Sequence, residues 1–113
     1  MGDRGQVCIQ FSTPNEKVYL YTHWGAYDLV DTVRGALAKR WRWDDPHYLA
    51  RIIFCEMVKG NEDEETGFGI DLIKHLDIWR LITVDCQNQK IVIEDHGKIA
   101  EESTFEEFIK RGN

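Results

Sequence analysis

The chain has 113 residues, with 14 basic and 20 acidic side chains and a formal net charge of −6. This length fits one domain, and the 42% hydrophobic and 12% aromatic content is typical of a folded chain. The negative balance disfavours general binding to nucleic acid or to an anionic membrane, because both need basic residues that displace counterions. We therefore expect residues 1–113 to form a single globular domain.

The N-terminal segment from Met1 to Gln6 is polar and lacks the apolar stretch of a signal peptide. No apolar run reaches the roughly 18 residues that a membrane span requires. Cys8, Cys55 and Cys86 are odd in number, far apart and set among apolar neighbours. This pattern favours three small core residues in a reducing compartment over a disulfide framework. The sequence therefore predicts a cytoplasmic protein with no membrane contact.

Apolar and polar residues alternate over residues 6–11 and again over residues 17–22. Between them, residues 12–16 supply turn chemistry, including Pro14, which cannot donate to a strand ladder. Two alternating runs joined by a short polar turn predict an antiparallel hairpin.

The period then changes to that of a helical pair. From Asp28 onward, apolar residues recur at helical spacing, namely Leu29, Val30, Val33, Ala36 and Leu37. Gly35 within this helix lowers its propensity and is expected to permit a close packing contact. The second helix is predicted over residues 47–59, because Asp44 or Asp45 can cap it and Pro46 fits near its first position.

The C-terminal half predicts a second hairpin. Residues 81–86 and 90–94 are apolar, β-branched runs separated by three polar residues. Before them, residues 67–70 are expected to form a turn or a short extended piece. Residues 71–79 are expected to form a short helix that carries Leu72, Ile73 and Leu76.

After the second hairpin, residues 98–100 are predicted to form a brief edge strand. Ser103 with Glu106, or Thr104 with Glu107, offers a capping box for a final short helix. The predicted order is β-β-α-α-β-β-α. We therefore expect an α+β fold: an antiparallel sheet of about four strands, with a helical pair and a short C-terminal helix packed on it.

The first candidate site is the strand–helix junction over residues 21–25, which contains His23 and Trp24. Such a junction exposes free backbone amides that can bind an anion. His23 could act as a base near neutral pH, and Trp24 could stack on a ring. The alternative is structural, with Trp24 packed into the core and His23 bonded to a backbone carbonyl.

The second candidate site joins the two helices and contains Trp41, Arg42 and Trp43, with Arg51 one turn further on. Tryptophans interleaved with arginines can stack on bases and pair with phosphates. Asp44 and Asp45 would repel a phosphate unless they face away. The structural alternative is that the tryptophans hold the helices together while the aspartates cap a helix and pair with Arg42 and Arg51.

An acidic run follows the second helix and consists of Glu62, Asp63, Glu64 and Glu65. It lacks the alternating ligand spacing and central glycine of a calcium loop, so a solvated loop is favoured over a metal site. As a weaker alternative, the loop contacts a basic protein partner. The four histidines show no metal-ligand spacing, and we expect no metal and no cofactor.

Catalytic motifs are absent from the sequence: it has no G-x-S-x-G, P-loop, G-x-G-x-x-G or C-x-x-C. The cysteines lie in apolar runs that raise a thiol pKa rather than lower it. These observations favour a protein that is not an enzyme. A small hydrolase or transferase that uses His23 with a carboxylate stays open as a third hypothesis.

Three segments together carry a resemblance: Tyr21-Thr22-His23-Trp24-Gly25, then Arg42-Trp43-Asp44-Asp45 through Tyr48-Leu49-Ala50-Arg51, then Thr66-Gly67-Phe68-Gly69-Ile70. With these motifs the chain resembles a set of small uncharacterised proteins of bacteriophages, prophages and other mobile elements. The resemblance implies a bacterial or phage source and an accessory role, and inhibition of host defence by binding is common in that setting. It assigns no functional residues.

Two function hypotheses follow from the residues and the resemblance. The first is a non-enzymatic, phage-related binding protein that inhibits a bacterial defence component by protein contact, with the acidic loop and the aromatic clusters as contact residues. The rival is a nucleotide-binding protein that sequesters a cyclic or other signalling nucleotide in an aromatic and arginine pocket built from the two candidate sites. The sequence leaves a homodimer and a monomer equally open. A homodimer is considered because exposed strand edges and aromatic patches tend to be covered in small domains.

Overall fold

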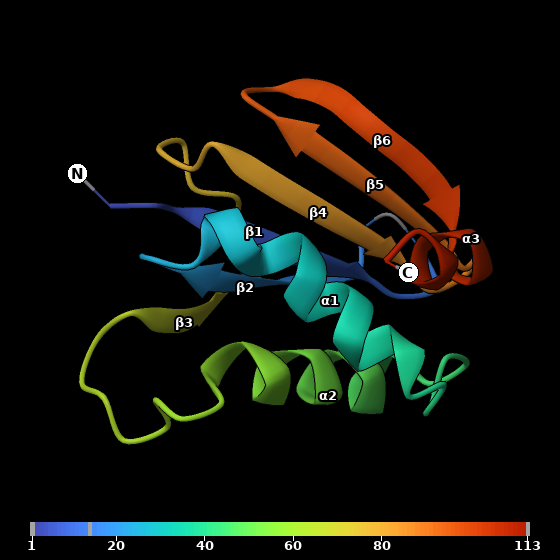
Figure 1. Ribbon diagram of the computed structural model, residues 1–113, viewed down its shortest axis with the longest axis horizontal. Coiled ribbons are helices and arrows are strands. Elements are labelled where there is room, and N and C mark those ends of the chain that lie inside the picture. Colours follow the sequence, from blue (N-terminus) through green and yellow to red (C-terminus); the bar gives the residue numbers. More distant parts are fainter. Residues whose placement is uncertain (1, 14, 113) are drawn as a thin grey trace.

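A computed structural model describes every residue except Met1, Pro14 and Asn113, and it shows an α+β fold (Figure 1). The strands are β1 (Gly5–Gln10), β2 (Lys17–Thr22), β3 (Phe68–Asp71), β4 (Arg80–Asp85), β5 (Lys90–Asp95) and β6 (Lys98–Thr104). The helices are the 3-10 turn η1 (Ala26–Asp28) and the α-helices α1 (Leu29–Ala38), α2 (Pro46–Val58) and α3 (Phe105–Lys110). Pro14, predicted within the first turn, lies outside the described residues.

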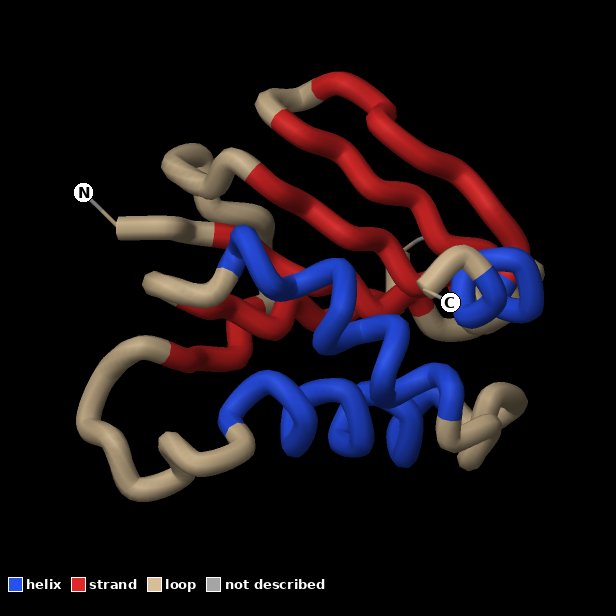
Figure 2. The backbone as a smooth tube through the Cα atoms, in the orientation of Figure 1, coloured by secondary structure: helices blue, strands red, loops and turns tan. Residues whose placement is uncertain are grey.

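The six strands form one mixed sheet in the order β3-β2-β1-β4-β5-β6 (Figure 2). The two predicted hairpins are confirmed, since β1–β2 and β4–β5 are antiparallel pairs. The prediction of a purely antiparallel sheet is wrong, because β1 and β4 pair in parallel, from Gly5 opposite Arg80 to Gln10 opposite Asp85. Alternation within a strand defines its two faces, and it carries no information about how two distant hairpins join.

The sheet also has two more strands than predicted, one at each edge. β3 pairs with β2, where a turn or short extended piece was expected, and β6 extends the expected brief edge to seven residues. Both strands have weak sequence signals because few of their side chains are buried. In β6, Ser103 is the one buried residue.

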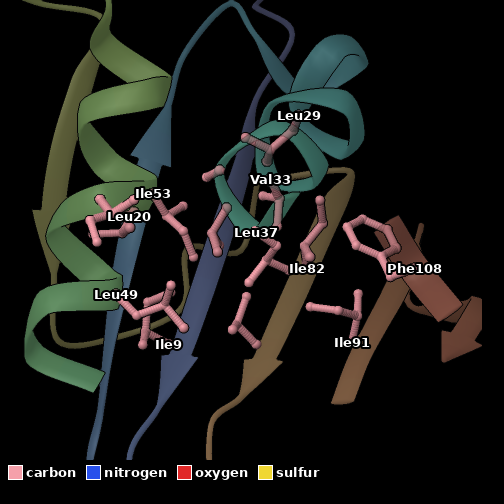
Figure 3. Close-up of a cluster of buried hydrophobic side chains, with 14 of the residues drawn as sticks. Ile9, Leu20, Leu29, Val33, Leu37, Leu49, Ile53, Ile82, Ile91 and Phe108 are labelled. Carbon is pink, nitrogen blue, oxygen red and sulfur yellow. The ribbon is translucent and has the colours of Figure 1, made fainter. Parts of the chain in front are cut away.

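The core lies between one face of the sheet and the three α-helices, as Figure 3 shows. In α1, Leu29, Val33 and Leu37 recur every four residues and are at most 2% exposed. The other large buried side chains come from every layer of the domain: Ile9, Leu20, Ile82 and Ile91 from the strands, Leu49 and Ile53 from α2, and Phe105 and Phe108 from α3.

The opposite face of the sheet has a much smaller apolar cluster. Cys8, Tyr19 and Leu81 form it, and Ile78 packs against them. Ile78 belongs to the segment of residues 72–79 that connects β3 to β4, which we call the β3–β4 loop. The loop therefore lies over the sheet face that the helices leave uncovered.

The expected helix over residues 71–79 is not formed. Asp71 ends β3, and the residues that follow make bends and turns up to β4. Leu72, Ile73 and Leu76 are 80%, 70% and 99% exposed, so their spacing does not reflect a buried helical face.

Helix ends follow local chemistry closely. The capping box of α3 is confirmed for Thr104 with Glu107: the Thr104 N–H donates to Glu107 Oε1 at 2.9 Å, and the Glu107 N–H donates to Thr104 Oγ1 at 3.1 Å. α2 is formed as predicted but begins at Pro46, directly before the predicted start at residue 47, and Asp45 at its N-cap makes no side-chain capping bond. Within residues 2–13 and 15–112, no helix is long and apolar enough to cross a membrane.

The cysteine prediction holds for two of the three thiols. Cys8 and Cys86 are buried, and burial raises the pKa of the Cys86 thiol to about 12. Cys55 is exposed, so its assignment to the core is wrong. The buried face of α2 is formed by Leu49, Ile52, Ile53 and Met57, and Cys55 lies on the solvent face, one turn after Arg51.

Gly35 has no packing role, contrary to the sequence-based expectation. A Cβ built on Gly35 meets no atom within 4 Å, and the residue lies exposed in the interior of α1. We expect Gly35→Ala to stabilise the domain by about 0.5–1 kcal/mol, because alanine loses less backbone entropy in a helix. Thermal unfolding should show a Tm rise of about 3–6 °C.

Gly67→Ala is the matched control for this glycine substitution. Gly67 has φ of +107°, and a Cβ there would lie 2.7 Å from Trp24 Cζ3, so this variant should be destabilised. A lowered Tm for Gly35→Ala would contradict the assignment of Gly35 as an unpacked helical residue.

Candidate functional site

At the strand–helix junction that the sequence marks as an anion site, three successive backbone amides already have partners within the chain. The Gly25 N–H donates to Thr22 Oγ1 at 3.0 Å, and the Ala26 N–H donates to the Asp3 carbonyl at 3.1 Å. The Tyr27 N–H donates to Asp3 Oδ2 at 2.8 Å. The chain's own Asp3 therefore occupies the place that a phosphate would take.

His23 makes aromatic contacts rather than a contact with a carboxylate. Its Nδ1 shares a hydrogen bond of 2.9 Å with the Tyr21 hydroxyl, and its ring stands edge-on to Trp24 at a centroid distance of 4.8 Å. Burial is the largest cause of a raised pKa for Tyr21, so this hydroxyl stays protonated at neutral pH. Among the described residues, no ion pair joins His23 to a carboxylate, so the arrangement expected for a His23 hydrolase has no support.

Trp24 is 59% exposed and borders a pocket of about 320 Å³, which we call the Trp24 pocket. This volume lies within the range of small-ligand sites. The pocket lies between the end of β2, the start of α1, the end of α2 and the acidic loop. Its lining residues are Thr22, Trp24, Gly25, Asp28, Leu29, Thr32, Met57, Asn61, Glu64, Thr66 and Phe68.

The charge of the Trp24 pocket comes from two carboxylates. Asp28 is the N-cap of α1, but its side chain makes no capping bond. Glu64 comes from the acidic loop, whose other three acidic residues do not line the pocket. The lining includes no lysine, arginine or histidine.

Gly67 packs against one side of the Trp24 ring and fixes its position. The close approach of Gly67 to the Trp24 ring requires a residue without a Cβ, and the Gly67 carbonyl accepts a hydrogen bond of 2.8 Å from the His23 N–H. Trp24 therefore packs against the chain on one side and faces solvent with the rest of its ring.

Beyond the C-terminal end of α1 lies a second, shallower depression of about 410 Å³, which we call the Trp41 hollow. It is lined by Trp41, Arg42, Tyr48, Arg51 and Ile52. Trp41 is 58% exposed, and the Arg42 guanidinium lies 4.7 Å from the centre of the Tyr48 ring. This arrangement can offer aromatic faces and positive charge to one ligand.

Trp43 has a mainly structural role. Its indole N–H donates to the Leu37 carbonyl at 3.1 Å, and its ring contacts Phe105 edge-on at 5.2 Å. Arg40, which lies over the Trp43 ring, forms an ion pair with Glu106 that lowers the pKa of this carboxyl. Trp43 thus joins the helix connection to α3.

The aspartates beside this hollow do not pair with the arginines, as the structural alternative required. Asp44 Oδ1 accepts a hydrogen bond of 2.9 Å from Gln89 Nε2. In the described part of the chain, no ion pair joins Asp44 or Asp45 to Arg42 or Arg51.

The two sites are separate surfaces. Trp24 precedes α1 and Trp41 follows it, and a helix of ten residues is about 15 Å long. The sequence did not indicate that Asp28 joins Trp24, nor that one residue of the acidic run completes the same pocket. A single pocket built from His23, Trp24, Trp41 and Arg51 is therefore not formed.

A third surface, which the sequence did not mark as a site, is the β3–β4 loop. Gln6 of β1 is fully buried beneath it: its Nε2 donates to the Ile73 carbonyl at 3.3 Å, and its Oε1 accepts from the His75 N–H at 2.9 Å. Arg4 forms an ion pair with Asp77. These contacts hold the loop on the sheet while the apolar side chains of Leu72, Ile73 and Leu76 face solvent.

His75 provides a further anchor within the same loop. Its ring stacks on Tyr21 at a centroid distance of 4.8 Å, and its Nε2 lies 2.8 Å from Asp71 Oδ2. This is a histidine–carboxylate pair, but it lies outside both the Trp24 pocket and the Trp41 hollow. Its contacts serve to orient the loop.

Comparison of the chain with protein-family models, with curated proteins and with solved structures finds no match. The described residues also contain no group of three or more His, Cys, Asp or Glu side chains that could hold a metal ion.

Removal of the Gln6 side chain should release the β3–β4 loop. Gln6→Ala removes both side-chain hydrogen bonds to the loop backbone, and a typical hydrogen bond contributes about 0.5–1.5 kcal/mol to stability. We expect a lower free energy of unfolding and faster amide hydrogen exchange over residues 72–79. Gln10→Ala, on the same face of β1, is the control and should leave both quantities nearly unchanged; unchanged exchange in Gln6→Ala would contradict the anchoring role.

Proposed function

We propose that this chain is a non-enzymatic binding protein that acts by contact with another protein. The observation that carries the proposal is the exposure of Leu72, Ile73 and Leu76 on the β3–β4 loop. Exposed apolar clusters rimmed by polar residues are typical of protein-interaction sites. Here the rim includes Lys74 and Asp77, both exposed.

The anchoring of this loop supports a binding role over a passive one. Its backbone is hydrogen-bonded to buried Gln6, so the apolar side chains are presented on a fixed frame. A preorganised loop loses little conformational entropy when it binds, and the gain from apolar burial is kept as affinity.

On the sequence resemblance to phage and mobile-element proteins we further propose a bacterial protein partner. We place the protein in the cytoplasm of a bacterial host, where it would bind a defence component and inhibit it. The acidic loop of Glu62, Asp63, Glu64 and Glu65 would add attraction to a basic partner. A homodimer through the β3–β4 loop is the competing use of the same surface.

The test combines Leu72→Ser, Ile73→Ser and Leu76→Ser in one variant. Loss of a binding hot spot costs about 2 kcal/mol or more, roughly 30-fold in Kd. In bacteria that carry defined defence systems, the wild-type protein should restore phage plaque formation against at least one system, and the triple variant should not. Binding to that system's purified component should weaken in parallel.

Ile99→Ser is the matched control, because Ile99 is 65% exposed on β6, at the opposite edge of the sheet. It should behave as the wild type in both assays. A triple variant with full activity and affinity would overturn the proposal. Analytical ultracentrifugation tests self-association. If the wild type is a dimer and the triple variant is a monomer with unchanged activity and affinity for the partner, the loop serves self-association instead.

A second candidate function, sequestration of a nucleotide, is favoured by the Trp41 hollow. Arg40 and Arg42 both have φ of 59°, a left-handed conformation that is uncommon for arginine. The residue between them is the exposed Trp41. Strained backbone that holds an aromatic side chain toward solvent, beside Arg42 and Arg51, fits a site for a base with a phosphate.

This second function predicts stabilisation by mono-, di- or cyclic nucleotides. Ligand at about 100 times its Kd should stabilise the fold by roughly 2.7 kcal/mol, which thermal unfolding would register as a raised Tm. Trp41→Leu and Arg51→Gln should abolish the shift, while Trp24→Leu should retain it. A flat response across the nucleotide panel would remove this candidate.

A further inference from the structure

The Trp24 pocket combines three features that point to one class of ligand. It has an aromatic wall, since Trp24 is 59% exposed. It has two carboxylates, those of Asp28 and Glu64. It has an apolar floor that includes Leu29, Met57 and Phe68.

The described residues leave the negative charge of the pocket without an ion-pair partner. Within residues 2–13 and 15–112, no ion pair involves Asp28 or Glu64. The usual use of an N-cap aspartate is to bond a backbone amide of the first helical turn, and the Asp28 side chain does not do so. Both carboxylates are therefore free to meet a positive group.

From this geometry we infer that the Trp24 pocket binds an organic cation that carries a guanidinium or primary ammonium group. The cation would lie against the Trp24 ring, where the ring quadrupole attracts it, and would donate hydrogen bonds to the carboxylates of Asp28 and Glu64. Its alkyl stem would cover the apolar floor. The source is either an arginine or lysine side chain of a protein or a free alkyl amine.

Other ligand classes fit this pocket less well. An anion would face two carboxylates without a basic residue in the lining. A hard metal ion such as Ca²⁺ takes six to eight oxygen ligands, whereas this lining offers two carboxylates and a few neutral oxygens beside an indole ring. The volume of about 320 Å³ lies within the range of small-ligand pockets, which gives room for one such side chain.

The test uses N-acetyl-arginine methylamide as the probe and N-acetyl-citrulline methylamide as its neutral control of nearly the same shape. Binding is followed by calorimetry and by ¹⁵N-edited NMR of the Trp24 indole. The arginine probe should bind and shift the Trp24 signal, with affinity that falls as salt rises. The citrulline compound should bind at least about tenfold more weakly.

Variants then assign the groups. Asp28→Asn, Glu64→Gln and Trp24→Leu should each weaken the arginine probe at least fivefold. Glu62→Gln is the matched control, because Glu62 belongs to the same acidic loop but does not line the pocket. Glu64 is on an exposed loop, so Glu64→Gln keeps the test decisive even if Asp28→Asn unfolds α1.

Two further probes distinguish the sources of the cation. Tighter binding of an arginine-containing peptide than of agmatine assigns the pocket to a protein side chain, and the reverse order assigns it to a free amine. Equal binding of the arginine and citrulline probes, or an unchanged affinity in Glu64→Gln, would overturn the inference. The cation site is independent of the proposed protein-contact function. The triple variant of the β3–β4 loop should therefore bind the arginine probe as the wild type does.

Discussion

The parallel pairing of β1 with β4 determines the arrangement of the rest of the domain. β3 is antiparallel to β2, and β2 is antiparallel to β1, so β3 runs in the same direction as β1 and β4. A chain that leaves the end of β3 must therefore return along the sheet and pass two strands before it enters β4. The helices fill one face of the sheet (Figure 1), so the return runs over the other face.

This route explains the chemistry of the β3–β4 loop. A connection that crosses a sheet without helical hydrogen bonds needs other partners for its backbone groups. Gln6 supplies a donor and an acceptor from within β1, and the Arg4 carbonyl accepts from the Trp79 N–H at 3.0 Å. Because these anchors engage the loop backbone and its polar side chains, the apolar side chains of Leu72, Ile73 and Leu76 are directed outward. The apolar surface is thus a consequence of the topology.

Sequence patterns predicted what depends on neighbouring residues. The two hairpins, the start of α2 at Pro46 and the Thr104–Glu107 capping box all follow from chemistry within a few positions. The β1–β4 pairing joins residues about 75 positions apart, and no local pattern encodes it. The same limit explains residues 71–79, where Leu72, Ile73 and Leu76 have helical spacing but no partner surface to bury them.

The candidate sites show the same limit of local sequence patterns. His23 and Trp24 stood out as residue types, but the chemistry around them depends on Asp3, Asp28, Glu64 and Gly67, which come from other segments. Asp28 suits the helix dipole when the sequence alone is considered, and it becomes a pocket carboxylate only when the acidic loop folds beside it. From the sequence alone, Gln6, the main anchor of the β3–β4 loop, cannot be distinguished from an ordinary polar residue of an alternating strand.

The three surfaces differ in the force that would drive binding. The Trp24 pocket is acidic, the Trp41 hollow is basic, and the two lie at opposite ends of α1. Attraction of a cation to the first and of an anion to the second both weaken as salt screens exposed charges. Association through Leu72, Ile73 and Leu76 depends on apolar burial, which salt screening leaves intact. A partner of the β3–β4 loop would lose only the attraction of the acidic loop at high ionic strength and would keep its apolar contacts. Ligands of the two charged sites would lose their main attraction, so salt dependence distinguishes the three surfaces.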